Sequence, residues 1–76
     1  MRELRKNTEL LYILHESEYG ELYFTVTCGG VGMYNVKIKL TSGERGSFQH
    51  QGDKFLHRLA REIRKNTQAF EARAIQ

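Results

Sequence analysis

Two neighbouring runs of alternating apolar and polar residues constrain the fold of this chain more than any other feature. The runs cover residues 21–28 and 33–40, and their alternating apolar positions are Leu22, Phe24, Val26, Cys28, Tyr34, Val36, Ile38 and Leu40. A period of two is typical of strands that bury one face. Gly29, Gly30 and Gly32 lie between the runs and permit a chain reversal. The pattern therefore predicts an antiparallel hairpin.

The side chains also predict how the two strands of this hairpin are paired. With the turn centred on Gly30, paired residue numbers sum to 60, so that Phe24 faces Val36 on the inner face. On the outer face the same register places Glu21 opposite Lys39, with opposite charges, and Tyr23 opposite Lys37. Because cross-strand pairs of these kinds stabilise sheets, we expect this register.

Three further segments are expected around the hairpin. Residues 9–15 predict an earlier strand, and its apolar residues fall on both faces, so the N-terminal segment or a second copy of the chain should cover one of them. A three-residue loop at Ser42-Gly43-Glu44 would lead into a short edge strand over residues 45–51. The segment Arg2–Thr8 allows a short N-terminal helix.

From Asp53 onward the apolar period changes to 3.6 residues, which predicts an amphipathic helix with Asp53 as its N-cap. Its apolar stripe consists of Leu56, Leu59, Ala60, Ile63, Phe70 and Ala74. We expect this stripe to pack across the inner face of the sheet. The chain, residues 1–76, is therefore predicted to be one small α+β domain: an antiparallel sheet of three to four strands packed on one C-terminal helix, in the order β-β-β-β-α.

Length and composition restrict the class of protein. A chain of 76 residues is too short for two domains or a large active-site cleft. Its longest apolar run, Leu10–Leu14, is far shorter than the roughly 20 residues of a membrane helix, and the start shows no signal-peptide pattern. The single cysteine, Cys28, fits a reducing compartment. We expect a cytoplasmic protein that has no membrane partner.

The net charge of +3 is concentrated in the two ends of the chain, and the helix carries its clearest cluster. Four cations share the side opposite the apolar stripe, within about 60° and over roughly 16 Å; they are Lys54, Arg58, Arg61 and Lys65. Only Glu62 lies among them. Such a row is suited to contact several phosphates, although a solvated helix face has the same composition.

Other cations extend this candidate interface. Arg64 flanks the row, and Arg2, Arg5 and Lys6 belong to a segment, Arg2–Thr8, that is repeated at Arg61–Thr67 with one change, Leu4 to Ile63. The repeat would supply two equivalent basic helical turns to one partner, or it is a coincidence in a basic chain. On the outer sheet face Tyr23, Lys37 and Lys39 could stack on bases and hold phosphate, or form an ordinary solvated face.

Catalytic and metal-binding patterns are weak. His15, His50 and His57 do not have the spacing of a zinc site, and Cys28 is either a nucleophile or a small buried side chain at a strand end. The run Gly29-Gly30-Val31-Gly32 leads into a strand, whereas phosphate loops lead into helices. We therefore expect no enzyme, no cofactor and no metal.

The sequence is best interpreted as a small, non-enzymatic binding protein that contacts nucleic acid, or a complex containing it, through the basic helix face. The alternative is a small protein interaction module, an inhibitor or adaptor of phage or mobile-element origin, that docks on an acidic protein surface. The apolar run Leu10–Leu14 favours a homodimer under either hypothesis.

Overall fold

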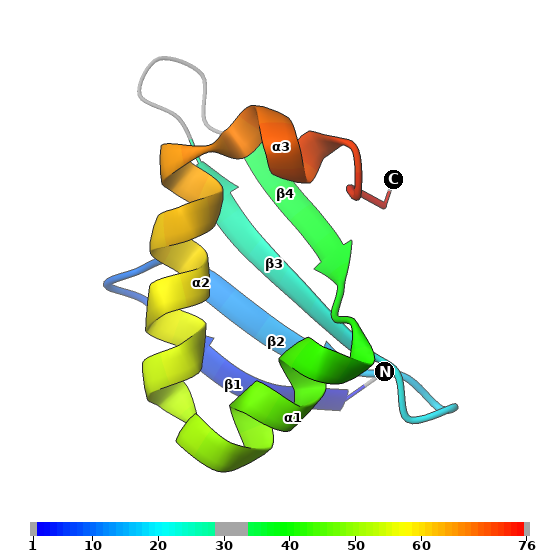
Figure 1. Ribbon diagram of the computed structural model, residues 1–76. Coiled ribbons are helices and arrows are strands. Elements are labelled where there is room, and N and C mark those ends of the chain that lie inside the picture. Colours follow the sequence, from blue (N-terminus) through cyan, green and yellow to red (C-terminus); the bar gives the residue numbers. More distant parts are fainter. Residues whose placement is uncertain (1, 29–33, 76) are drawn as a thin grey trace.

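The fold consists of a four-stranded antiparallel sheet followed by three helices. The computed structural model describes residues 2–28 and 34–75. The strands follow one another across the sheet in chain order: β1 (Arg2–Asn7), β2 (Tyr12–Glu16), β3 (Leu22–Cys28) and β4 (Tyr34–Lys39). The helices are α1 (Ser42–Gln51), α2 (Asp53–Lys65) and α3 (Thr67–Glu71) (Figure 1). The predicted α+β class with an antiparallel sheet is confirmed.

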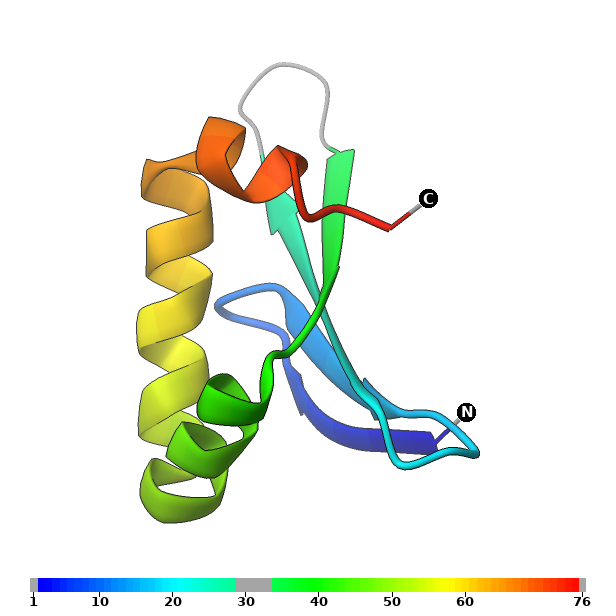
Figure 2. The same ribbon diagram turned by 45° about the vertical axis from the view of Figure 1, so that its right-hand side comes forward.

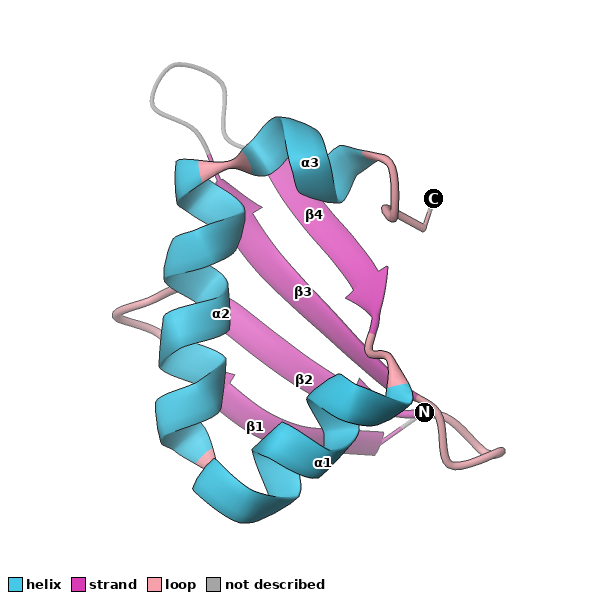
Figure 3. Cartoon of the chain, in the orientation of Figure 1, coloured by secondary structure: helices cyan, strands magenta, loops and turns pink. Residues whose placement is uncertain are grey.

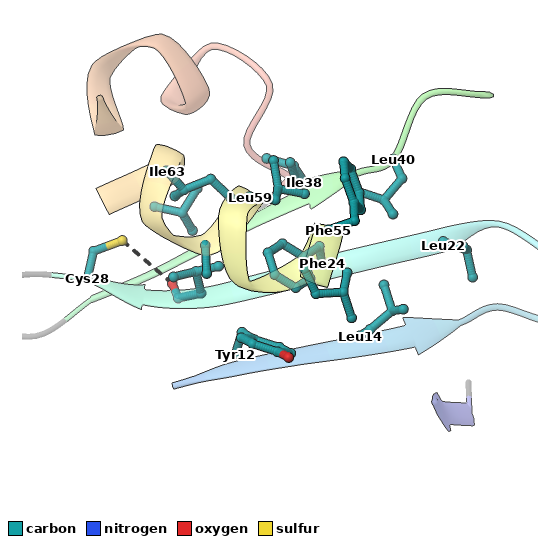
Figure 4. Packing of buried hydrophobic residues seen from close by; sticks show 14 residues of the cluster. Tyr12, Leu14, Leu22, Phe24, Cys28, Ile38, Leu40, Phe55, Leu59 and Ile63 are labelled. Atoms are coloured by element: carbon teal, nitrogen blue, oxygen red, sulfur yellow. Dashed lines mark hydrogen bonds between the residues drawn. The ribbon is translucent and has the colours of Figure 1, made fainter. Parts of the chain in front are cut away.

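All three helices lie on one face of the sheet, with α2 in the middle and α1 and α3 at its two ends (Figures 2 and 3). Within the described residues the opposite face carries no helix, and we call it the bare face. The core forms between the strands and α2, as the close view in Figure 4 shows. Its fully enclosed members include Leu14, Phe24, Ile38, Leu56 and Ile63. The apolar residues that alternate along the strands and those that recur every 3.6 residues along α2 thus pack against one another in one layer.

Seven of the eight apolar positions predicted for the hairpin are buried, the exception being Tyr34, which is 44% exposed. Cys28 is buried at the end of β3, with its Sγ 3.8 Å from the carbonyl oxygen of Val26 (Figure 4). Burial raises the pKa of the Cys28 thiol, despite the opposing effect of the nearby Arg64 charge. A thiol that resists ionisation is a poor nucleophile, which favours the packing role for this cysteine.

The hairpin of β3 and β4 is confirmed, but its register differs from the predicted one by two residues. Phe24 pairs with Ile38 and Val26 with Val36, so paired numbers sum to 62. A slip of two keeps every side chain on its own face, and the alternating pattern therefore cannot distinguish the two registers. The turn predicted at Gly30 lies outside the described residues.

The strand predicted over residues 45–51, with its loop at Ser42-Gly43-Glu44, is wrong, because this segment forms α1. A capping box begins the helix: Thr41 Oγ1 accepts from the Glu44 amide at 3.2 Å, and Glu44 Oε1 accepts from the Thr41 amide at 2.8 Å. Burial alone would raise the pKa of Glu44, but hydrogen bonds from Arg73 and Thr41 outweigh it and hold that pKa below its usual value. The sequence signal for this start was Thr-x-x-Glu at Thr41–Glu44.

The short N-terminal helix allowed at Arg2–Thr8 is also wrong, because residues 2–7 form β1 and pair with β2. The pairing shifts between Glu3 and Arg5, which makes Leu4 the extra residue of a β-bulge. After β1, the Asn7 Oδ1 accepts from the amides of Glu9 at 2.9 Å and Leu10 at 2.7 Å. These bonds form a turn, so that β2 begins at Tyr12 rather than at residue 9.

This turn explains part of the pattern in Leu10–Leu14, whose apolar residues fall on both parities. Tyr12 and Leu14 face the core, whereas Leu10 and Leu11 precede the strand, and Leu10 packs against the edge of the core. Ile13 alternates with Tyr12 and Leu14 in β2 and lies half-buried on the bare face, so the turn accounts for Leu10 and Leu11 but not for Ile13.

The C-terminal helix is divided in two, which corrects the prediction of one continuous helix. Gly52, with φ of 64°, separates α1 from α2 and takes the N-cap position that was predicted for Asp53. This backbone conformation favours glycine. Asn66 ends α2, after which α3 brings Phe70 against the core and Ala74 forms an isolated bridge with Ile38. The chain therefore returns to β4 at its end.

Candidate nucleic-acid interface

Four exposed cations follow the outer side of α2 and define the α2 basic stripe: Lys54, Arg58, Arg61 and Lys65. The buried residues of the same helix, among them Leu56 and Ile63, face the sheet. At 1.5 Å per residue, the stripe extends for about 16 Å along the helix. The amphipathic pattern therefore determines which way the cations point: because the apolar side is fixed on the sheet, the charged side faces away from it.

Within the described residues, the four cations of the stripe form no ion pair with a carboxylate, whereas four cations elsewhere in the molecule do. In the described part of the chain the ion pairs join Arg2 to Glu16 at 2.6 Å, Arg5 to Asp53 at 3.2 Å, Arg73 to Glu44 at 2.6 Å, and Lys39 to Glu21. No stripe residue takes part in one, although Arg58 donates to the Gln51 amide oxygen at 2.9 Å. The positive charge of the stripe is therefore left for a partner or for solvent.

Arg64, predicted to flank the stripe, has a structural role. Its Nε donates to the Thr27 carbonyl at 3.3 Å, and its Nη2 donates to the Leu10 carbonyl. The half-buried guanidinium thereby connects α2 to the end of β3 and to the turn before β2. Because these backbone acceptors hold the guanidinium, Arg64 is not included in the α2 basic stripe.

The predicted N-terminal cations do not extend the stripe. Arg2 and Arg5 point to the helix side and are ion-paired, and the Arg5 guanidinium lies 5.7 Å from the Phe48 ring centroid. Lys6 pairs with Ile13, between the inward-facing Arg5 and Asn7, and so lies on the bare face. Since this segment is a strand, the predicted pair of equivalent basic helical turns is wrong.

The predicted aromatic and basic cluster on the sheet lies on the bare face and is largely satisfied by its own members. The Lys37 ammonium lies 5.4 Å from the centroid of the Tyr23 ring, and the Tyr23 hydroxyl donates to Glu21 at 3.3 Å. Hydrogen bonding to Glu21 raises the pKa of Lys39. This cluster and the α2 basic stripe lie on opposite sides of the molecule, so one flat surface cannot contact both.

A hollow of about 420 Å³ lies near the C-terminal end of α2, between Leu11, Cys28, Tyr34 and Arg64. Its thiol resists ionisation and its arginine is held by backbone carbonyls. His57, one of the three histidines considered as metal ligands, packs against Tyr12 with ring centroids 5.8 Å apart. Among the described residues, no group of three or more potential ligands could hold a metal ion.

Comparisons of this chain with protein-family models, curated proteins and solved structures gave no significant match. None of the described helices has the length and apolar character needed to cross a bilayer. Function is therefore inferred from the α2 basic stripe and from the sheet.

Proposed function

We propose that this protein binds nucleic acid through the α2 basic stripe. The observation that carries the proposal is the clustering of unpaired cations: the four stripe residues are exposed, share one side of one helix and have no ion pair among the described residues. Lys6 and Lys37, likewise without an ion pair in the described part of the chain, lie apart from them on the bare face. Neutralising phosphates with such cations releases condensed counterions, which is the main source of non-specific affinity for nucleic acid.

The dimensions of the stripe suit a phosphate backbone. Along one strand of B-DNA the phosphates rise 3.4 Å apart, so a 16 Å stripe runs beside roughly four to five of them. Lysine and arginine contacts to phosphates fix position but carry little sequence information. We therefore expect binding with weak sequence preference and strong dependence on salt.

The direct test is fluorescence anisotropy with a labelled 20-base-pair DNA duplex, measured from 50 to 200 mM salt. Four phosphate contacts predict a slope of log K against log salt of about −3.6, which is a loss of roughly a hundredfold in affinity over this range. A flat salt dependence, or no binding at 50 mM, would contradict the proposal. A labelled single strand of the same length tests whether the duplex is needed.

Charge-removing variants locate the interface. Arg61→Gln and Lys65→Gln should each reduce the steepness of the salt slope by about 0.9, and together by about 1.8. The matched control is Lys37→Gln, which removes the same charge from the bare face and should leave the slope unchanged. Equal losses in all three variants would show that only net charge matters and would overturn the assignment to α2.

A protein partner on the bare face is a second candidate, favoured by one observation. The Nδ1 atom of His15 is buried there and has no hydrogen-bond partner among the described residues. Buried nitrogen atoms are usually satisfied, so a group from a partner protein could complete this one. The test is a pull-down from a native lysate treated with nuclease. This candidate replaces the first if a protein is retained, if His15→Phe abolishes its retention, and if the chain does not bind DNA.

A further inference from the structure

The two edges of the sheet differ in how they are covered. At β4, the Ile75 amide donates to the Lys37 carbonyl at 2.7 Å, and Arg73 Nη2 donates to the Lys39 carbonyl at 3.1 Å. The C-terminal segment thus occupies this edge around Ile38. β1 forms the other edge, and within the described residues no strand or terminal segment is paired along its outer side. The Leu4 carbonyl of this edge accepts from its own neighbour, Arg5 Nη1, at 2.8 Å. The other outward backbone groups of an edge strand are a template for another strand.

The charges of β1 select the kind of strand that fits. Arg2 and Arg5 point toward the helix side, where Glu16 and Asp53 neutralise them. The bulge at Leu4 places Glu3 and Lys6 together on the bare face, because Glu3 pairs with His15 and Lys6 with Ile13 of β2. These two have opposite signs, and in the described part of the chain neither has an ion-pair partner. Two β1 strands placed side by side in antiparallel orientation can therefore match the negative charge of one with the positive charge of the other.

We propose that β1 pairs with β1 of a second copy of this chain, antiparallel and about a two-fold axis. In the register that places Glu3 opposite Lys6 of the second copy, paired numbers sum to nine, so Arg2 lies opposite Asn7. Each such pair has both side chains on the same face, as antiparallel pairing requires. The two-fold axis makes the Glu3–Lys6 pair twice, and opposite charges directly across strands stabilise the pairing.

The same features act against other strands. A bulge and lysine or arginine side chains are the devices by which proteins protect an edge from indiscriminate pairing, and β1 has both. A strand without the matching order of charges would leave Glu3 or Lys6 opposite a neutral or like-charged residue. The inference uses only β1 and does not depend on nucleic-acid binding.

Sedimentation equilibrium of the full chain at low salt tests the pairing. The mass should rise from 8.9 kDa toward twice that value as concentration increases to about 1 mM. Lys6→Glu places like charges opposite each other twice and should weaken dimerisation by about tenfold or more. Glu3→Lys should do the same, whereas the double variant Glu3→Lys with Lys6→Glu restores opposite signs and should recover the dimer.

Far-UV circular dichroism and urea unfolding of each variant show whether the monomer remains folded. A control, Leu11→Glu, changes an exposed residue of the apolar run Leu10–Leu14 and should leave the dimer unchanged. A monomeric wild type at all concentrations would overturn the proposal. So would a dimer that is insensitive to the single charge reversals, or a folded double variant that stays monomeric.

Discussion

Two segments of this molecule have nearly the same sequence and different structures. Arg2–Thr8 and Arg61–Thr67 agree at six of seven positions, yet residues 2–7 form β1 and residues 61–65 are the last turn of α2. The one difference opposes local preference, since the β-branched Ile63 is in the helix and Leu4 is in the strand. Local propensity therefore does not decide either structure, and packing with the rest of the chain does.

The packing of the two segments explains why their structures differ. Ile63 is fully enclosed in the core, as the fifth buried residue of a helix with a continuous apolar side, whereas Leu4 is half-buried at a bulge. Arg64 donates to two backbone carbonyls, whereas Arg5 makes an exposed ion pair with Asp53. The segment Arg61–Thr67 is helical because it continues the helix that the residues before it form. The segment Arg2–Thr8 forms a strand because it pairs with β2.

The largest expected effect on stability is at the single apolar position of the two segments, Ile63 and Leu4. Ile63→Ala should lower the free energy of unfolding by about 3–4 kcal/mol, because it opens a cavity in an enclosed site. Leu4→Ala, at a half-buried bulge, should cost about 1 kcal/mol. Urea unfolding followed by circular dichroism measures both. Equal losses would mean that β1 contributes as much to the core as α2 does.

The next largest difference is expected between Arg64 and Arg5, which occupy the same position in the two segments. Arg64→Gln should destabilise the protein by about 2 kcal/mol, because charged hydrogen bonds to the Leu10 and Thr27 carbonyls are lost. Arg5→Gln removes an exposed ion pair and should cost less than about 1 kcal/mol. Both variants lose the same charge, so a difference in unfolding midpoint reports position alone. If Arg64→Gln is as stable as wild type and loses affinity for DNA instead, Arg64 belongs to the interface.

At the asparagine position the larger loss of stability is expected in Arg2–Thr8, the reverse of the two comparisons above. Asn7→Ala should cost about 1.5 kcal/mol, because Asn7 accepts two backbone hydrogen bonds in the turn after β1. Asn66 is exposed at the end of α2, and Asn66→Ala should change stability by no more than about 0.5 kcal/mol. Chemical denaturation of both proteins decides this, and a larger loss at Asn66 would contradict the ranking.

The smallest effect is expected from exchanging the one differing residue. A double variant, Leu4→Ile with Ile63→Leu, makes each segment adopt the other's sequence and should cost about 1 kcal/mol or less. Circular dichroism should show unchanged helix and strand content. A loss of helix content would mean that this single residue, and not packing, directs the two structures.

The sequence predicted the α+β class, the β3–β4 hairpin, its buried face and the core side of α2, since all of these follow from periodicity. It did not determine the register, because a slip of two residues keeps Phe24 and Val36 on the same face. α1 was missed because a strand over residues 45–51 would have placed Phe48 on the inner face of the sheet, although Thr41 and Glu44 carried a capping-box signal.

The remaining differences came from long-range contacts. Arg2–Thr8 has one apolar residue in seven, so its structure depends on pairing with β2, which periodicity cannot show. For the candidate interface, periodicity placed Lys54, Arg58, Arg61 and Lys65 on one side of α2 correctly. It could not exclude Arg64 from the candidate interface, because the carbonyls that hold Arg64 come from residues 37 and 54 positions away.

The contact of the C-terminal segment with β4 has a consequence for the size of the proposed assembly. With Ala74 bridged to Ile38 and Ile75 bonded to Lys37, the edge of β4 is occupied around Ile38, and the proposed pairing would extend the sheet at β1. Growth from one side of each molecule has a single outcome, a closed pair, because no second side remains to add a third copy. If β1 pairs as proposed, residues 73–75 would therefore favour a closed pair over an open fibre.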